Sequence, residues 1–546
     1  MATFNRGTRF MPHIEKKSVS RRGFLQVTSI ATAAAVSTKG YGFSLWTKTY
    51  PSEHRDHIII GSGFGGSITA FRLAEQGIAS MIIEQGRRWD QKLAPGKTRF
   101  SKNLYPDGRS TWLSHKTVIP LGPALPIPKS TGVLQGRKLA GKMVLNGAAY
   151  GGGSIVYGGC LVKPTEAVYN LVYPSDVPYS EISPYYDRAF TKLKGSNIPE
   201  DVFNEEPFRH VRVAKEQAEK AGVEWDWVAS GTDWDIVRDE ISGKIDPSLI
   251  HGEAIYGVNS GGKTTMDQTY LKDAEATGLL EVRTLYQVQD IGFDTTVSLY
   301  TVSVNELNVD GDVIAKRSFT CKKLFLTAGT VSSTSLLVKA KAKGTLPELN
   351  TEIGQGWGNN GNNYGLRLFV GEKTGKWQGG PPSIAMKDFS DPENPVFLEH
   401  PQLPVGIEIS GLLYGGIGIN RTRGTFVWNE NNKEVEILYP ENDPGQEKIN
   451  EGLVKILDKL NDANGGITSS LLTYLKGPVK SDMCYHPMGG VVMGRAADFY
   501  GRVKGYEGLY VNDGSFLPGS SAGTNPSLTI SAFAERNMDK ILAEDF

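Results

Sequence analysis

Hydrophobic residues change their spacing twice between residues 57 and 84. A continuous apolar run at 57–60 is followed by apolar residues at helical intervals, including Ala70, Leu73 and Ala74, and then by a second run at 80–83. Short continuous runs are typical of buried strands, whereas the intermediate spacing is typical of a helix. The pattern predicts a strand, a helix that ends near Gly77, and a second strand.

The predicted turn before the helix is rich in glycine, and an acidic residue ends the second strand. Gly61 allows a tight turn, Gly63 lets the backbone approach a pyrophosphate, and Gly66 lets the helix pack closely and direct its N–H groups at phosphates. Glu84 can accept hydrogen bonds from both ribose hydroxyls of an adenosine, and its charge would repel a 2′-phosphate. We therefore expect a dinucleotide site at Gly61, Gly63, Gly65, Gly66 and Glu84 that disfavours NADP.

Later segments supply the strands and helices that this small unit lacks. They are β-rich residues 280–288, a hairpin pattern at 297–314 around 310–312, an apolar run at 323–327 leading into 328–330, a helix through Leu336 and Leu337, a strand at 508–512, and an amphipathic helix at 530–541. Strands that alternate with helices favour an α/β fold. The sequence thus predicts a discontinuous, Rossmann-like dinucleotide domain.

The remaining blocks are expected to form a second, α+β domain over the cofactor. Residues 96–251 and 357–477 hold most of the prolines and aromatics, and we expect a β-sheet there as the floor of a substrate site. The dinucleotide domain then consists of residues 46–95, 252–356 and 478–546, and residues 1–45 remain as a signal and linker. A chain of 546 residues is long enough for two domains.

A glycine-rich stretch, residues 150–159, interrupts the first part of the second domain. So many glycines are costly unless the backbone must run against something flat. The bulky Ile155, Val156 and Tyr157 within the stretch argue against a flexible linker. We expect this segment to face a planar ring such as an isoalloxazine.

Charge and cysteine content exclude several classes of protein. Lys plus Arg and Asp plus Glu both number 59, so no general basic field favours nucleic acid. Cys160, Cys321 and Cys484 are widely spaced and form no CxxC, which argues against a zinc site or a disulfide framework, although one pair could still form. We expect no metal, so redox chemistry would need an organic cofactor.

The first residues are typical of an export signal. Lys16 and Lys17 precede a twin-arginine pattern at residues 20–25, and an apolar run from Val27 to Val36 follows. That run is too short to span a bilayer, and no other segment is long and apolar enough. We expect a soluble protein that is exported to the periplasm or secreted, and a monomer.

Motifs near the C-terminus resemble a known family. They are Cys484–Gly490 with the sequence CYHPMGG, Asp513-Gly514-Ser515, Gly523–Pro526, Gly356–Gly361, Tyr500–Arg502 and Ala534–Asp539. From about residue 54 to 546 the chain is similar to the flavin-dependent glucose-methanol-choline (GMC) oxidoreductases, and within them to bacterial cholesterol oxidases with non-covalent FAD. The resemblance implies FAD as cofactor. The resemblance and the glycine stretch together assign further cofactor contacts to Gly152, Ser154, Gly158, Gly159, Val288, Ala328, Gly329, Asp513, Gly514, Asn525 and Pro526.

The resemblance also implies three catalytic residues. His486 corresponds to the histidine that hydrogen-bonds the substrate hydroxyl, Asn525 to the asparagine at the flavin edge, and Glu399 to the glutamate that shuttles protons. Chemistry supports this set, because oxidising an alcohol needs an acceptor or base at the oxygen, and a carboxylate in an apolar cavity has a raised pKa. We expect the neighbouring His400 and the other histidines to be structural. Tyr157 and Cys160 depart from the family pattern near the expected oxygen route.

The expected function is oxidation of a 3β-hydroxysteroid, with electrons passed to oxygen to give hydrogen peroxide and with a Δ5 to Δ4 double-bond shift. The partners are then a sterol, molecular oxygen and, transiently, a sterol-containing membrane. Three alternatives are a flavin dehydrogenase of another bulky alcohol with a different acceptor, a sterol-binding protein, and an NAD-dependent dehydrogenase. The C-terminal motifs would lack a purpose in the last of these.

Overall fold

Five of the predicted β segments lie side by side in one parallel sheet in the computed structural model. The sheet has the order β10 (Leu280–Thr284), β4 (Ser80–Glu84), β3 (His57–Ile60), β14 (Lys323–Leu326) and β24 (Leu509–Val511). Ile58, Ile59 and Ile60 are buried, which explains the unbroken apolar run because strands of a parallel sheet are covered on both faces. The predicted α/β class is confirmed.

The helix between β3 and β4 is also as predicted. Helix α2 (Phe64–Glu75) ends just before Gly77, which has a φ of 75°. It packs on β3 and β4 and contacts α8 (Tyr270–Ala276) and α11 (Pro526–Glu544), and α11 in turn packs on α4 (Tyr179–Lys192).

The predicted hairpin is part of an antiparallel meander. Strands β11 (Tyr286–Asp294), β12 (Leu299–Leu307) and β13 (Val313–Cys321) pair in order, and the short β1 (Lys48–Thr49) and β2 (Glu53–His54) pair with β13. Helix α9 (Thr330–Ala342) follows β14 and packs against β11.

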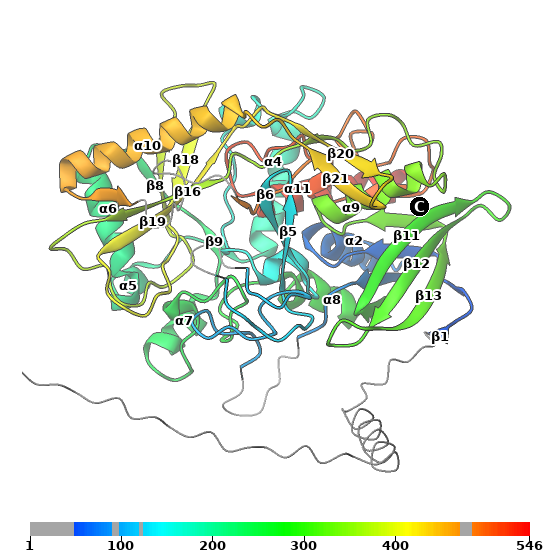
Figure 1. Cartoon of the computed structure of the whole chain (residues 1–546), viewed down its shortest axis with the longest axis horizontal. Coiled ribbons are helices and arrows are strands. Elements are labelled where there is room, and N and C mark those ends of the chain that lie inside the picture. The colour runs from blue at the N-terminus through cyan, green and yellow to red at the C-terminus, as the bar shows by residue number, and fades with distance from the viewer. Residues whose placement is uncertain (1–47, 90–97, 119–123, 470–482) are drawn as a thin grey trace, which may run out of the picture. The chain divides into compact units, whose positions relative to one another are not determined.

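A second large sheet forms the expected floor. Its order is β22 (Ile467–Ser469), β16 (Asn363–Leu368), β19 (Gly411–Gly418), β18 (Val396–Glu399), β17 (Ile384–Asp388) and β8 (Trp225–Trp227), and all of its pairs are antiparallel. Helices α6 (Arg209–Lys220) and α10 (Pro444–Asn464) contact this sheet and share an apolar core with it. Figure 1 shows this assembly on the left and the β11–β13 meander on the right.

The remaining strands and α-helices are short. They are β5 (Leu134–Leu139), β6 (Lys142–Gly147) and β23 (Met483–Cys484) in one sheet, β15 (Gln355–Trp357), β20 (Gly424–Asn429) and β21 (Glu434–Leu438) in another, β7 (Gly195–Ser196) paired with β9 (Ser230–Gly231), and helices α3 (Glu166–Tyr169), α5 (Glu200–Phe203) and α7 (Trp234–Ile241).

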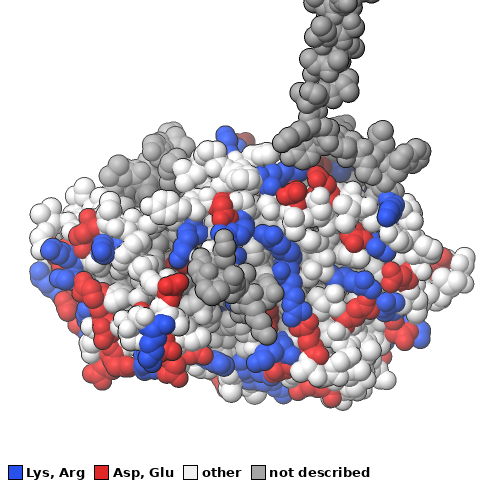
Figure 2. Space-filling model, turned by 90° about the horizontal axis from the view of Figure 1, so that it is seen from below, with Lys and Arg blue, Asp and Glu red and all other residues white. Residues whose placement is uncertain are grey.

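The structure describes residues 48–89, 98–118, 124–469 and 483–546. Residues 48–546 form one compact unit, and the predicted export signal lies outside the described residues. None of the helices in the described ranges has the length and apolar character needed to cross a bilayer. Figure 2 shows basic and acidic side chains interspersed on one face of the molecule. The domain boundaries given above stay a prediction.

Candidate active site

A cavity of about 1300 Å³ runs between the two large sheets. Its walls include Gly61–Gly65 and Glu84 from the parallel-sheet side, and Tyr364, Glu399 and Leu413 from the antiparallel sheet. Pockets for drug-sized ligands occupy roughly 300–1,000 Å³. The cavity is therefore large enough for a dinucleotide together with a substrate.

Glycine backbone builds the end of the cavity beside α2. Gly61 has a φ of 97°, and a Cβ there would lie 2.5 Å from the carbonyl oxygen of Thr327. A Cβ on Gly65 would overlap the carbonyl oxygen of Asn512, and one on Gly66 would overlap that of Gly61. Gly63 differs, since a Cβ there would meet nothing closer than the Cα of Gly152 at 4.0 Å. Gly63 thus leaves the room that a phosphate group needs.

The Glu84 carboxylate lies at the end of β4 and lines the cavity. It accepts hydrogen bonds from the N–H of Ser62 at 3.0 Å, the hydroxyl of Ser62 at 2.8 Å and the N–H of Gly86 at 2.7 Å. Burial raises its pKa. Glu84 therefore holds the phosphate-facing turn in place, a role the sequence did not suggest, and it stays available to a ribose.

Asp513 plays a similar role after β24. Its carboxylate accepts from the N–H of Gly329 at 2.9 Å, the hydroxyl of Ser333 at 2.6 Å, and the N–H and hydroxyl of Ser515 at 2.8 and 2.6 Å. Burial raises its pKa. The side chain joins the start of α9 to the turn after β24, and both segments line the cavity.

Most of the predicted cofactor residues line this one cavity. They are Gly61, Gly63, Gly65, Glu84, Gly152, Gly158, Val288, Ala328, Gly329, Asp513, Gly514, Asn525 and Pro526. Three others lie behind its wall: Gly66 packs α2 against the turn, the Ser154 hydroxyl donates to the Gly151 carbonyl and accepts from the N–H of Met266, and Gly159 packs near Pro381. These three shape the wall and do not face the cavity.

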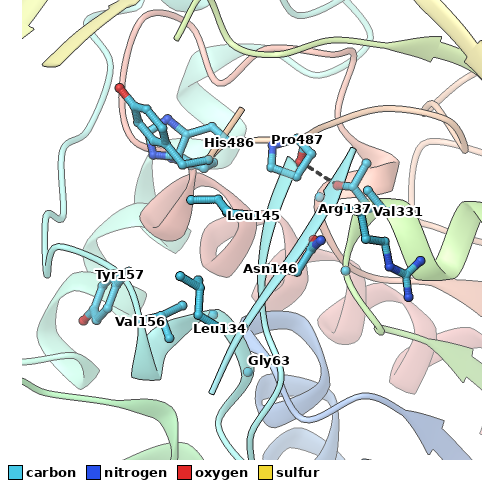
Figure 3. A pocket seen from close by; sticks show the side chains of 18 of the residues that line it. Gly63, Leu134, Arg137, Leu145, Asn146, Val156, Tyr157, Val331, His486 and Pro487 are labelled. Carbon is cyan, nitrogen blue, oxygen red and sulfur yellow. Dashed lines mark hydrogen bonds between the residues drawn. The ribbon is translucent and has the colours of Figure 1, made fainter. Parts of the chain in front are cut away.

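The glycine-rich stretch forms a tight turn along the cavity. Residues Gly152–Ile155 form one turn of 3₁₀ helix, and a Cβ on Gly152 would lie 2.5 Å from the Cα of Gly63. Val156 and Tyr157 line the cavity, and the Tyr157 hydroxyl donates to the Thr264 carbonyl at 2.6 Å. In Figure 3, Leu134 and Leu145 point into the space between Val156 and His486. The stretch is thus an ordered wall and no linker.

Glu399 and Asn525 form a buried pair in the cavity wall. Glu399 ends β18, and Asn525 precedes Pro526, the first residue of α11. Residues at this position often cap their own helix, but the Asn525 amide instead donates to Glu399 Oε2 at 3.1 Å. Glu399 Oε1 and Asn525 Oδ1 have no partner among the described residues. Burial raises the pKa of Glu399 to about 7.

Asn362 fixes the orientation of His486. Asn362 Oδ1 accepts from the N–H groups of Tyr485 and His486 at 3.1 and 3.0 Å, so its amide nitrogen donates to His486 Nδ1 at 2.9 Å. Burial lowers the pKa of His486 to about 3, so the ring is neutral. With Nδ1 accepting, the proton of the neutral ring resides on Nε2. His486 is therefore arranged to donate a hydrogen bond to a substrate oxygen.

One further anchor holds the turn that carries His486. The Thr330 hydroxyl, at the start of α9, donates to the Pro487 carbonyl at 2.7 Å, shown as the dashed line in Figure 3. Neither Asn362 nor this anchor came from the sequence analysis. The motif Gly356–Gly361 directly precedes Asn362 in the sequence. The motif did not show that Asn362 would contact His486.

Cys160 lines the cavity and lies beside Glu399, whereas His400, Cys321 and Cys484 do not line the cavity. His400 is buried beside His210, with 2.7 Å between His400 Nε2 and His210 Nδ1, and its Nδ1 donates to the Leu413 carbonyl at 2.8 Å. Cys160, Cys321 and Cys484 are free and buried, so the disulfide that the sequence left open is not formed. Cys160 lines the cavity beside Tyr157. The described residues contain no cluster of potential metal ligands.

Three family models match the chain. Residues 55–354 match the model described as GMC oxidoreductase, residues 360–473 match its C-terminal model, and residues 441–534 match a further GMC oxidoreductase model. The first match alone covers more than half of the chain. The chain belongs to the GMC oxidoreductases. Members of this family bind FAD, and the chain is a flavoprotein of this type.

Individual relatives are more distant. The chain is 26% identical to a cholesterol oxidase of Mycobacterium tuberculosis, over 88% of this chain and 90% of the relative. It is 24% identical to a cholesterol oxidase of Acinetobacter baumannii, over 90% of this chain and 94% of the relative.

Among solved structures, pyridoxine 4-oxidase from Mesorbium loti matches with a TM-score of 0.61 at 14% identity, covering 90% of this chain and all of that one. A fungal aryl-alcohol oxidase matches with a TM-score of 0.61 at 15% identity, covering 90% and 99%. These two share the fold.

The geometry of the cavity fits FAD. Gly61–Gly65 and Glu84 suit the pyrophosphate and ribose of its adenosine half, because the turn is open at Gly63 and a carboxylate lies beside it. The glycine-rich turn that begins at Gly152 lies beside Gly63 and lines the same cavity as Asn525 and His486.

Proposed function

We propose that this flavoprotein oxidises the 3β-hydroxyl of a cholesterol-like sterol to the 3-ketone, reduces O₂ to H₂O₂, and shifts the Δ5 double bond to Δ4. The observation that carries the proposal is the buried Glu399–Asn525 pair, whose free oxygens line an apolar cavity near the start of α11. The similarity to two cholesterol oxidases, over 88% and 90% of this chain, supports it.

The substrate end of the cavity suits a large apolar molecule. Its wall consists mostly of aliphatic and aromatic side chains: Leu134, Leu145, Ile255, Tyr364, Leu366, Leu403, Ile409, Leu413 and Met483. Apolar walls with a few placed polar groups are typical of small-molecule sites, and here the polar groups are Glu399, Asn525 and His486. A sterol matches this wall, because it carries one polar hydroxyl on a rigid apolar hydrocarbon.

His486 and Glu399 have different roles in the proposed oxidation. FAD, once bound, would supply the acceptor for a hydride from the alcohol carbon. His486 Nε2–H donates to the alcohol oxygen and orients the carbon, while the ionised Glu399 carboxylate accepts the hydroxyl proton. The alcohol thus loses a hydride and a proton, and O₂ gains the two electrons and two protons to become H₂O₂. Because Glu399 ionises near pH 7, the rate of proton removal should rise with pH through that value.

Glu399 also suits the double-bond shift. Moving a proton from C4 to C6 of the initial ketone needs one base that can take up and return a proton, and a carboxyl with a pKa of about 7 does both near neutral pH. Glu399→Gln should slow the oxidation, because an amide cannot accept the hydroxyl proton, and should slow the shift as well, so that the ketone that still forms accumulates as the unconjugated 5-en-3-one. Conjugated ketone formed at the parental rate, faster than free isomerisation in buffer, would show that another residue is the base.

Exposed apolar residues at the cavity mouth favour transient contact with a sterol-containing membrane. Leu104 and Val405 line the cavity and are partly exposed, and the adjacent Tyr105 and Ile407 are 82% and 63% exposed. A Cβ on Gly406 would lie 3.0 Å from Leu104 Cδ1, so the two segments are neighbours. Tyr105→Asp with Ile407→Asp should slow turnover of sterol in vesicles but not of detergent-dispersed sterol. We further propose that the protein acts as a monomer after export by the twin-arginine signal.

A second candidate is a dehydrogenase of another bulky alcohol that uses a quinone. Tyr157 and Cys160 favour it, because both line the cavity at positions where they depart from the family pattern.

One assay separates the two candidates. Cholesterol and other sterols, an aryl alcohol and a pyridine alcohol are compared under air and with a quinone under argon, and ketone or aldehyde and peroxide are both measured. Peroxide and 4-en-3-one from sterols alone are expected. Turnover confined to the quinone arm, or to the aromatic alcohols, would contradict the proposal.

A further inference from the structure

Lys263 is a buried lysine behind the glycine-rich turn. It is 2% exposed, and its Nζ donates to the carbonyls of Ile155 and Tyr157, both at 2.8 Å, and of Ala254 at 3.2 Å. The three protons of an ammonium are thus all used. Its stem passes Gly159, where a Cβ would lie 4.0 Å from Lys263 Cγ. Lys263 therefore holds the backbone of the cavity wall from behind.

The residue after Lys263 holds the same wall. The Thr264 carbonyl accepts from the Tyr157 hydroxyl at 2.6 Å, and Lys263 Nζ lies 5.2 Å from the centre of the Tyr157 ring. Val156, Tyr157 and Gly158 face the cavity on the opposite side of this wall. A charge on Lys263 is therefore separated from the cavity by a single layer of backbone.

No carboxylate in the described ranges forms an ion pair with this ammonium. Asp267 acts on it only through space, and burial raises the pKa of Asp267 and so favours its neutral form. Burial lowers the pKa of Lys263 to about 7. A buried cation without a partner is costly, and neutral donors could clamp three carbonyls equally well. The charge calls for a further explanation.

We propose that Lys263 is a positioning residue whose ammonium supplies positive charge to the flavin ring and favours its reduced form. This inference rests on the proposed placement of the ring against residues 152–158. Accepting a hydride adds one negative charge to the ring, and a nearby cation in a medium of low dielectric constant stabilises that charge. The N-terminus of α11, where Asn525 and Pro526 line the cavity, adds partial positive charge.

The test is the midpoint potential of the FAD-loaded protein at pH 6, below the pKa of Lys263, titrated with dithionite and a reference dye in the absence of any alcohol. Lys263→Met removes both the charge and the hydrogen bonds, Lys263→Gln keeps two donors without charge, and Lys263→Arg keeps the charge. We expect the Met and Gln variants to lose 10- to 100-fold of the preference for reduced over oxidised FAD, which is a shift of about −30 to −60 mV. The Arg variant should stay close to the parent.

Lys341→Met is the matched control. Lys341 Nζ also caps a carbonyl, that of Asn350 at 2.8 Å, but the residue does not line the cavity. Its replacement should leave the potential unchanged.

Each outcome decides the question. A parental potential in Lys263→Gln, or a lowered one in Lys263→Arg, would overturn the role of the charge, as would loss of FAD from all three variants. Loss of FAD from the Met and Gln variants with retention by Arg would support it. Because no alcohol is present, the result does not depend on whether the substrate is a sterol.

Discussion

The two ends of the cavity are built in opposite ways. At the nucleotide end, glycine backbone forms the wall and the buried carboxylates of Glu84 and Asp513 each accept three or more hydrogen bonds from the protein. At the substrate end, side chains form the wall, and Glu399 Oε1 and Asn525 Oδ1 lack partners within the described part of the chain. These two atoms lie in the cavity wall, where a ligand could supply the missing hydrogen bonds.

This difference shows which end of the cavity has its hydrogen bonds and packing complete before a ligand binds. The nucleotide end is a fixed frame, because the carboxylates of Glu84 and Asp513 are satisfied and Gly61, Gly65 and Gly66 touch main chain that cannot give way. The substrate end stays incomplete until an alcohol supplies the missing hydrogen bonds. Changes at the first end should therefore act on folding and cofactor retention, and changes at the second on turnover.

The largest effect is expected from Gly65→Ala, because the new methyl group would overlap the carbonyl oxygen of Asn512 at the end of β24. Such overpacking against main chain should destabilise the protein by about 3 kcal/mol or more. Gly63→Ala is the matched change, since its backbone is extended, with φ −70° and ψ −164°, and the methyl would face the cavity.

The two glycine variants are compared by thermal unfolding without FAD and by FAD titration. Gly63→Ala should unfold like the parent yet bind FAD more weakly, whereas Gly65→Ala should lose stability first. Equal loss of stability in both variants would contradict the distinction between frame and ligand site.

His486→Ala should have the next largest effect, with turnover reduced about 10²-fold or more and FAD retained.

Asn362→Asp tests whether Asn362 sets the tautomer of His486. Its second oxygen would face His486 Nδ1 and draw the proton there, so the pKa of His486 should rise and Nε2 should become an acceptor. The measurement is the pH dependence of kcat/KM, and an unchanged profile would show that Asn362 does not set the tautomer.

The same division explains how much could be predicted from sequence. Short-range sequence patterns predict the frame at the nucleotide end. One strand, helix and strand contain the isoleucines before Gly61, the spaced glycines and Glu84. The substrate end joins residues from distant segments, such as Asn362 with His486 and Lys263 with Tyr157. Only the family resemblance selected Glu399, Asn525 and His486. Asn362 and Lys263 stayed unnoticed, because an isolated asparagine or lysine carries no spacing that marks it as buried.

Glu84→Ala should have an intermediate effect, because Glu84 belongs to the frame and also faces the ribose. Loss of charge-assisted hydrogen bonds should weaken FAD retention by about 1 to 3 kcal/mol. Glu84→Gln serves as control, since an amide can keep one acceptor for Ser62. FAD remaining bound to the Ala variant through equilibrium dialysis as tightly as to the parent would exclude the ribose contact.

Stability at the substrate end should change with the opposite sign. Because the pKa of Glu399 is about 7 in the folded protein and 4.5 ordinarily, the folded state keeps a proton that the unfolded chain releases between these values. Glu399 thus destabilises the fold progressively as pH rises from 4.5 to 7, by up to about 3 kcal/mol above that window. Glu399→Gln removes this cost, so with saturating FAD its Tm should match the parent at pH 4.5 and exceed it at pH 8. Glu240→Gln is the control, because that buried carboxylate accepts from the N–H groups of Ser248, Leu249 and Ile250 and its loss should destabilise the protein at both pH values. If both glutamine variants lowered Tm at pH 8, Glu399 would belong to the frame, and the contrast between the two ends of the cavity would fail.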